Sequence, residues 1–469
     1  MKLKKLSLAC AATLMSGQAL ALTPAVTPDL NIYISGASAQ DKALAALVGN
    51  LCVAGTLDTF KDLSATSDGK AYTSYFCTID STQVDGMSVD QDVLINKRSA
   101  GGSGKGVQVV ADAVPIEAMN IFNGNCTETA AGSREWTCTV TNPNDLILQV
   151  SDAGISDVEP AMFTGLNTPA GDVAVTPSQV AKLDITSMNA VVFGVPVTEA
   201  LYRALQQGQG LTVGLDDEAN MPTLSMAEVN GLITGNLSNW DNYKINGVSL
   251  RNIPGVTAPT LDAPLNRPLV HVCRRVPGSG TQAQMNAVFA NAPCAAGVQQ
   301  PARAPGNAIL GPIVEESSSS GGVTTCLATK NTGNKWAIGV QSLEKLDPSF
   351  RFVKIDGYAP TLKNVAENKY IDWVETTMQW RKSAEGGPSG DVLNILTTIA
   401  QNASTPATIA SLNTAFVHGF GTGAYLALNT NGFVPSFPHD DANPVTTATH
   451  APVGVPNTCN KPTVNYVAP

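Results

Sequence analysis

The chain has 469 residues, of which 43% are hydrophobic and 14% are charged, and its formal net charge is −10. This length exceeds what one hydrophobic core usually supports, so we expect at least two domains. The low charge content argues against a long charged disordered segment, and the acidic balance argues against a protein held mainly by nucleic acid phosphates. Binding of a small anion is not excluded, because a few oriented N–H groups can outweigh the global charge locally.

The first residues are typical of an export signal. Three lysines within the first five residues precede the apolar run 6–15, and Ala19-Leu20-Ala21 is a small-x-small cleavage site. The apolar run is too short to span a bilayer, and no later stretch is long and apolar enough to do so. We therefore expect residues 1–21 to be removed and the mature chain to be periplasmic or secreted.

Strand-like and helix-like segments alternate in the first third of the chain. Residues 31–34 predict a strand that leads through the turn 35–39 into a helix over 41–51. Residues 93–96 predict a second strand, followed by a glycine-rich turn and a helix over 107–113. Two such units predict an open α/β sheet, in which ligands bind at the carboxyl ends of the strands. Residues 118–150, rich in Asn, Thr and Gly, are expected to form a disulfide-closed surface excursion.

A second α/β segment follows. It contains predicted strands at 191–197, 269–273 and 336–341, and predicted helices at 198–207, 225–233 and 282–290. Ser225 with Glu228 three residues later has the pattern of a helix-starting capping box. The serine run 317–320 is expected to be a loop inside this second domain. Residues 440–469 are expected to form a loosely structured tail held by Cys459.

Eight cysteines remain after the signal, and an even number in an exported chain predicts disulfides. Sequence does not fix their connectivity. The nearest-neighbour hypothesis pairs Cys52 with Cys77, Cys126 with Cys138, Cys273 with Cys294, and Cys326 with Cys459. The absence of a Cys-x-x-Cys motif gives a redox or zinc function little support, and we expect no cofactor.

Three turns rich in Gly, Ser and Thr precede predicted helices: Gly36-Ala37-Ser38, Gly102-Ser103-Gly104 and Gly278-Ser279-Gly280-Thr281. Free backbone N–H groups at a helix start favour an anion, as does the helix dipole. A serine before a helix is most often simply a cap, so one such turn is weak support. The third turn, however, follows Arg274-Arg275, and a guanidinium group matches an oxyanion with two parallel hydrogen bonds.

Several segments together resemble the type 2 periplasmic binding proteins of the phosphate ABC transporter. They occur in the family's order across residues 30–375: Ser35-Gly36-Ala37-Ser38-Ala39, residues 102–107, Ser156-Asp157-Val158-Glu159-Pro160, residues 224–241 with Trp240-Asp241, residues 274–281, residues 336–340, and residues 355–361. The Arg-x-x-Gly-Ser-Gly-Thr motif is the most specific of them. Pro277 departs from the pattern, because the family commonly has an acidic residue there that orients the arginine.

The resemblance implies an α/β fold of two domains joined by a hinge of crossing strands. Domain I would comprise residues 28–190 and 342–440, including the insertion 118–150. Domain II would comprise residues 191–341, and residues 441–469 would be a C-terminal extension. The implied partners are a phosphate ion and an inner-membrane ABC permease, with no nucleic acid and no transmembrane segment.

The resemblance also implies a set of anion ligands from both domains. Domain II would contribute Arg275, Ser279, Gly280 and Thr281, and domain I would contribute Ser38, Ala39, Ser103, Gly104 and Asp157. Asp157 would select phosphate, because a carboxylate facing an anion is unfavourable unless it accepts a proton from that anion, and sulfate has none at neutral pH. The alternative is that Asp157 caps a helix beginning at Val158.

Other functions have less support in the sequence. Gly278-Ser279-Gly280 lacks the Gly-x-Ser-x-Gly pattern of a hydrolase nucleophile, and nothing places His418 near it, so we expect no enzymatic activity. His439, Asp440, Asp441 and His450 match no standard metal spacing. Arg274 is expected to form a surface or interdomain ion pair, and Trp240 and Trp336 to lie in the core. A second hypothesis is a secreted or surface protein that reuses the binding-protein fold for adhesion or assembly.

Overall fold

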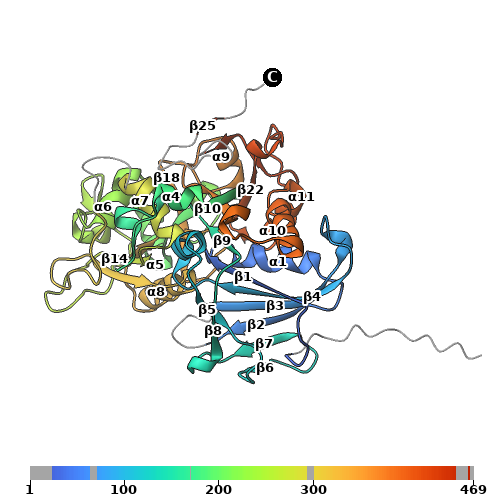
Figure 1. Cartoon of the computed structure of the whole chain (residues 1–469). Coiled ribbons are helices and arrows are strands. Elements are labelled where there is room, and N and C mark those ends of the chain that lie inside the picture. Colours follow the sequence, from blue (N-terminus) through green and yellow to red (C-terminus); the bar gives the residue numbers. More distant parts are fainter. Residues whose placement is uncertain (1–23, 64–70, 170, 293–299, 450–462, 465–469) are drawn as a thin grey trace, which may run out of the picture.

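The computed structural model describes residues 24–63, 71–169, 171–292, 300–449 and 463–464. The predicted signal segment, Cys294 and Cys459 lie outside these residues. The described residues form two α/β lobes (Figure 1). Among the helices of this described part, none is both long enough and apolar enough to cross a membrane.

The first lobe is built on one long mixed sheet. Its strand order is β6-β7-β2-β3-β4-β1-β9-β19-β10-β22-β23. The bounds are β1 Leu30–Gly36, β2 Asp58–Asp62, β3 Tyr72–Ile79, β4 Gln91–Arg98, β6 Cys126–Glu128, β7 Glu135–Cys138, β9 Ala153–Ser156, β10 Leu183–Thr198, β19 Trp373–Arg381, β22 Tyr425–Leu428 and β23 Val445–Thr446. Helices α1 (Asp41–Leu51) and α10 (Gly390–Asn402) pack their apolar faces on it, with Leu44, Leu47, Ile395 and Ile399 fully buried.

The second lobe has a smaller sheet with the order β15-β14-β16-β10-β18-β11. Its bounds are β11 Thr223–Leu224, β14 His271–Arg275, β15 Ile313–Ser317, β16 Ala337–Gly339 and β18 Phe350–Ile355. The helices around it are α5 Glu199–Gly208, α6 Met226–Thr234, α7 Gly280–Ala290 and α8 Ser320–Thr332. Trp240 and Trp336 meet edge to face in its core and are both 0% exposed, as expected. The capping box of Ser225 and Glu228 starts α6, and the serine run 317–320 connects β15 to α8 inside this lobe.

Strand β10 joins the lobes. Its first part, up to Val192, pairs with β19 in the first sheet, and Val195–Thr198 pair with β18 in the second. The α/β fold of two lobes joined by crossing strands is therefore the observed fold. The pairing of β18 with β10 and β11 associates residues 350–355 with the second sheet, whereas the expected boundary at 342 assigned them to the first domain.

Residues 126–138 of the expected surface excursion over 118–150 are part of the first sheet. Strand β7 pairs in parallel with β2, and the Cys126–Cys138 disulfide joins the two residues that face each other across the β6–β7 pair. Trp136 stacks on Phe60 with 5.4 Å between ring centroids, and the pair contributes to a small core of its own. The insertion therefore extends the sheet away from the lobe junction.

The disulfide pairing was predicted in part. Cys52–Cys77 and Cys126–Cys138 are confirmed, but Cys273 pairs with Cys326. The pairings of Cys273 with Cys294 and of Cys326 with Cys459 are therefore wrong. The physical reason is that α8 packs directly over β14, which brings residues 53 positions apart to a Cα–Cα distance of 5.8 Å.

Within the described part of the expected loose tail, residues 445–446, 448–449 and 463–464 form strand pairs, whereas Cys459 and its neighbours lie outside the described residues. Residues 445–446 form β23 beside β22, and β24 (Ala448–Thr449) pairs with β25 (Thr463–Val464). Val445, Thr446 and Ala448 are buried, and Thr447 N–H donates to the Ala366 carbonyl over 2.9 Å. Alternating Val, Ala and Thr have strand propensity, which the nearby prolines and asparagines obscured.

Candidate anion-binding site

The first turn of the site connects β1 to α1. Gly36 has φ +115°, and a Cβ atom there would lie 2.0 Å from the Ile155 carbonyl oxygen of β9, so this position requires glycine. The turn places Ser38 at the start of α1, where it is 7% exposed. Lys97, which the sequence analysis did not select, is buried beneath the turn and donates from Nζ to the carbonyls of Gly36 and Ala37 over 3.1 and 3.0 Å.

The second turn brings Ser103 beside Asp157. The helix expected over 107–113 is a single turn, α3 (Gln108–Ala111), and the glycine-rich turn before it contains another, α2 (Gly102–Lys105). Ser103 Oγ accepts a hydrogen bond from the Asp157 N–H over 3.1 Å. Asp157 follows the end of β9 and is 1% exposed. No helix begins at Val158, since the next turn starts at Pro160, so the capping alternative for Asp157 is wrong.

Arg275 is the last residue of β14 and is 2% exposed. Its Nε and Nη2 donate to the carbonyls of Ser317 and Ser318 over 3.2 and 2.7 Å. These two carbonyls hold the guanidinium plane, a role that the family pattern gives to the acidic residue replaced by Pro277. Nη1 donates to the hydroxyls of Ser38 and Ser320, each over 3.0 Å, so one cation contacts both lobes.

Helix α7 begins at the third turn. Ser279 occupies its N-cap position, yet its hydroxyl makes no capping hydrogen bond. Ser279 Oγ, Thr281 Oγ1 and Asp157 Oδ1 are all buried without a hydrogen-bond partner among the described residues. Buried polar atoms are nearly always paired, so three such atoms in one place indicate that they serve a ligand.

The two glycine-rich turns touch each other across the junction of the lobes. The Gly104 N–H donates to the Gly278 carbonyl over 2.8 Å. A Cβ atom on Gly280 would lie 2.5 Å from Ser103 Oγ and 2.6 Å from Asp157 Cβ. The backbone of Gly280 is therefore packed directly against the two candidate ligands from the first lobe.

We expect Gly280→Ala to weaken binding of a small anion at least tenfold, because the added methyl group would separate Ser103 and Asp157 from the α7 N-terminus. Gly231→Ala is the matched control, because its Cβ would lie 3.5 Å from the nearest side-chain atom, an ordinary contact on helix α6. Titration calorimetry of both variants checks this. Equal affinity in the two variants would contradict the close packing at Gly280.

Ser320 is a candidate ligand that the sequence analysis missed. It begins α8, it is 5% exposed, and its Oγ lies 3.1 Å from Ser38 Oγ. Both hydroxyl oxygens accept from Arg275, so at least one of the two hydroxyl hydrogens remains available to an acceptor. The run of four serines before a helix was the available signal, but it was interpreted as a loop.

The electrostatics of the site combine two buried cations, Arg275 and Lys97, with the buried carboxyl group of Asp157. Burial raises the pKa of Asp157 to about 7, against a smaller lowering effect of Arg275. Burial also lowers the pKa of Arg275 to about 10, which still leaves it charged at neutral pH. A buried guanidinium with hydroxyl donors and one exchangeable carboxyl proton suits a small oxyanion.

The other residues that the sequence analysis singled out contact groups different from the unpaired atoms described above. Ala39 is fully buried, and its carbonyl accepts from Tyr425 Oη over 3.0 Å. Arg274 forms an ion pair with Glu316 over 2.9 Å and is 6% exposed, so it is an ion-pair residue within the second lobe rather than at the surface. His439 contacts Asp441, while His450 lies outside the described residues. Within the described ranges, no group of three His, Cys, Asp or Glu side chains could hold a metal ion.

No protein-family model and no curated protein matches the chain. Among solved structures, the chain is similar to a phosphate ABC transporter substrate-binding protein from Clostridium perfringens with bound phosphate, at 14% identity and a TM-score of 0.42, covering 81% of this chain and 97% of that one. It is also similar to an ABC-type phosphate transport receptor from Vibrio cholerae, at 11% identity and a TM-score of 0.40, covering 82% and 98%.

A third similar structure is PstS from Borrelia burgdorferi, at 10% identity and a TM-score of 0.36, covering 84% of this chain and 99% of that one. Identities and TM-scores this low assign no ligand to the chain, so its ligand has to be argued from the site's own atoms.

Proposed function

We propose that the chain is an exported solute-binding protein that captures phosphate between its two lobes, for uptake by an ABC permease or for scavenging. One observation carries the proposal. Asp157 Oδ1 from the first lobe and the hydroxyls of Ser279 and Thr281 from the second are buried and unpaired beside Arg275. The group combines donors, a positive charge and one proton acceptor.

This combination favours phosphate over other tetrahedral anions. The hydroxyl and guanidinium donors would bind the unprotonated oxygens of phosphate. The Asp157 carboxylate would accept the proton that monohydrogen and dihydrogen phosphate carry. Sulfate has no proton at neutral pH, so it would face the carboxylate with an unpaired acceptor, which is unfavourable.

The two-lobed arrangement supports capture by closure. Ligand groups come from both sides of β10, and binding would favour the conformation in which the Gly104–Gly278 contact forms. In the proposed function, a permease would distinguish this closed form from an open one.

Thermal unfolding tests the proposal. A ligand that binds the folded state stabilises it by about 2.7 kcal/mol at a concentration 100 times its dissociation constant. We expect phosphate to raise the melting temperature of the ligand-stripped protein at pH 9, where Asp157 is ionised, and sulfate to leave it unchanged at that pH. Equal shifts with both anions would indicate a general ionic effect and would contradict the proposal.

A second role in adhesion or assembly is favoured by the surface of the insertion. Strands β5 (Ile116–Met119) and β8 (Leu146–Gln149) form a separate antiparallel pair. Leu148 on β8 is 67% exposed, and Phe122, three residues after the end of β5, is 45% exposed. In this second role, these two side chains would form part of the contact surface. Sedimentation of the protein with and without phosphate tests this role, which predicts multimers that Leu148→Ser together with Phe122→Ser dissolves.

A further inference from the structure

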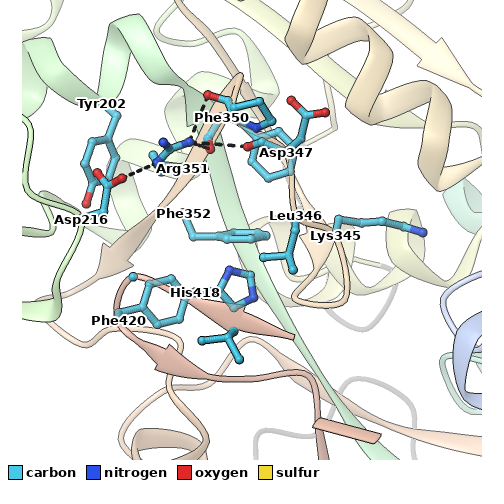
Figure 2. A pocket seen from close by; sticks show the side chains of 13 residues that line it. Tyr202, Asp216, Lys345, Leu346, Asp347, Phe350, Arg351, Phe352, His418 and Phe420 are labelled. Carbon is cyan, nitrogen blue, oxygen red and sulfur yellow. Dashed lines mark hydrogen bonds and ion pairs between the residues drawn. The ribbon is translucent and has the colours of Figure 1, made fainter. Parts of the chain in front are cut away.

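A second pocket lies outside the anion site. Its volume is about 400 Å³, within the range of small-molecule sites. The second lobe lines it with Tyr202 of helix α5, with Asp216 and with residues between 345 and 352. Residues 417–420 line the rest; they comprise β20 (Val417–His418) and the turn that leads into β21 (Gly421–Thr422). Figure 2 shows the pocket from close by.

The pocket is formed where the β20–β21 turn meets the second lobe. A Cβ atom on Gly419 would lie 2.5 Å from the Asp216 carbonyl oxygen, so the turn touches the Asp216 loop at this glycine. His418 Nε2 lies 2.8 Å from the Leu343 carbonyl and donates to it. These two contacts hold the β20–β21 turn against the second lobe, and the pocket lies between that turn and the lobe.

Aromatic rings make up one side of the pocket. His418 and Phe420 stack with 4.8 Å between centroids and 7° between planes. Phe352 meets His418 edge to face at 5.5 Å. Figure 2 shows Phe352, His418 and Phe420 together on the side opposite Asp216 and Arg351. These spacings are those of rings packed on one another, and a further aromatic ring that entered the pocket would pack on this group in the same stacked or perpendicular geometries.

The charged side chains of the pocket all have protein partners: three are ion-paired, and Asp347 accepts hydrogen bonds from the N–H and the hydroxyl of Ser349. Asp216 accepts from Arg203 with one carboxylate oxygen and from Arg351 with the other, each over 2.7 Å. Lys345 contacts Glu344 over 2.7 Å. A charged ligand would have to compete with these ion pairs, whereas an uncharged ligand would leave them intact.

His418 supplies a hydrogen-bond acceptor. Burial lowers the pKa of its ring to about 4, so the ring is neutral at physiological pH. Because Nε2 carries the hydrogen that bonds to Leu343, Nδ1 carries a lone pair. The complementary group is an O–H or N–H on the ligand.

We propose that this pocket is a second ligand site, which binds an uncharged aromatic ring compound that carries a hydrogen-bond donor. The site is independent of the proposed phosphate function. The stacked His418–Phe420 pair and Phe352 would contact the ring, and His418 Nδ1 would accept from the donor.

Ligand-observed saturation-transfer NMR tests the proposal with three probes: phenol, benzoate and cyclohexanol. We expect phenol to bind with a dissociation constant on the order of 1 mM, as is reasonable for a small fragment. Benzoate keeps the ring but adds a charge, and cyclohexanol keeps the hydroxyl but lacks the aromatic ring. Both should bind at least tenfold more weakly.

Two variants locate the binding. Phe420→Ala removes one ring, and Leu346→Trp places a larger side chain at the pocket, where Leu346 is 48% exposed. Each should weaken phenol binding at least tenfold, whereas Phe122→Ala, an exposed ring on the insertion, should not. Phosphate titration of the same samples verifies folding. Unchanged phenol binding in both pocket variants, or equal binding of the three probes, would overturn the proposal.

Discussion

Arg275→Ala is expected to weaken phosphate binding about 100-fold or more. A hydrogen bond to a charged group contributes about 1.5–3 kcal/mol, and each 1.4 kcal/mol changes affinity tenfold, so the loss of two such bonds gives this magnitude. The substitution also removes the donor that holds the hydroxyls of Ser38 and Ser320 together. Titration calorimetry at neutral pH measures the change.

The neighbouring arginine provides a matched control. Arg274 lies one residue earlier on the same strand and carries the same charge, but it pairs with Glu316. We expect Arg274→Ala to reduce stability and to leave phosphate affinity within about threefold of the wild type, since the position of a charge matters more than its presence. Equal losses in the two variants would mean that the net charge of β14, and not a site at Arg275, determines binding.

Sulfate binding is expected to depend on pH through Asp157. Its pKa of about 7 lies above the ordinary value of 3.8, so the folded protein keeps the carboxyl protonated at mildly acidic pH. A protonated carboxyl can donate to a sulfate oxygen, and an ionised one cannot. Because affinity scales with the fraction of the competent form, sulfate should bind about 100-fold more weakly at pH 9 than at pH 6. Phosphate should lose far less, because monohydrogen phosphate brings its own proton.

Asp157→Asn should remove both the pH dependence and the discrimination, because the amide donates a hydrogen bond at every pH. Asp372→Asn is the control. Burial raises the pKa of Asp372 to about 7 as well, but its carboxylate accepts from Gln284 rather than facing the candidate ligands. We expect Asp372→Asn to keep the sulfate profile of the wild type. A flat sulfate profile in the wild type, or an unchanged profile in Asp157→Asn, would show that Asp157 does not select the anion.

The linkage between Asp157 and stability has the same origin. Between pH 3.8 and about 7 the folded protein binds more protons at this residue than the unfolded chain does. The free energy of unfolding contributed by Asp157 therefore decreases as pH rises through this window. An anion that supplies a proton to the ionised carboxylate offsets this loss, so stabilisation by phosphate should persist above pH 7.

Local patterns were sufficient for most of the fold. The strand before Gly36, the capping box at Ser225 and the buried run through β10 were predicted because apolar periodicity, caps and glycine turns are local signals. The pairing of Cys273 with Cys326 was not, because it depends on α8 packing over β14. Strand β23 was missed because it is only two residues long, lies among prolines and asparagines, and is held in place by pairing with β22.

The candidate site was predictable where one motif contains the contact. Arg275, Ser279 and Thr281 lie within seven residues of each other, and Asp157 came from the family resemblance. Lys97 and Ser320 were missed, because each reaches the site from an element distant in sequence: Lys97 lies on β4 beneath the β1–α1 turn, and Ser320 starts α8. Which polar atoms remain unpaired is a property of packing and cannot be obtained from a motif.

Calorimetric titration of the ligand-stripped protein without its signal segment, with phosphate and then with sulfate at pH 9, tests the central claim most directly. At this pH Asp157 is mostly ionised, phosphate carries a proton and sulfate carries none. The account predicts saturable binding of one phosphate per chain and no heat with sulfate. No heat with phosphate, or equal binding of the two anions, would contradict it.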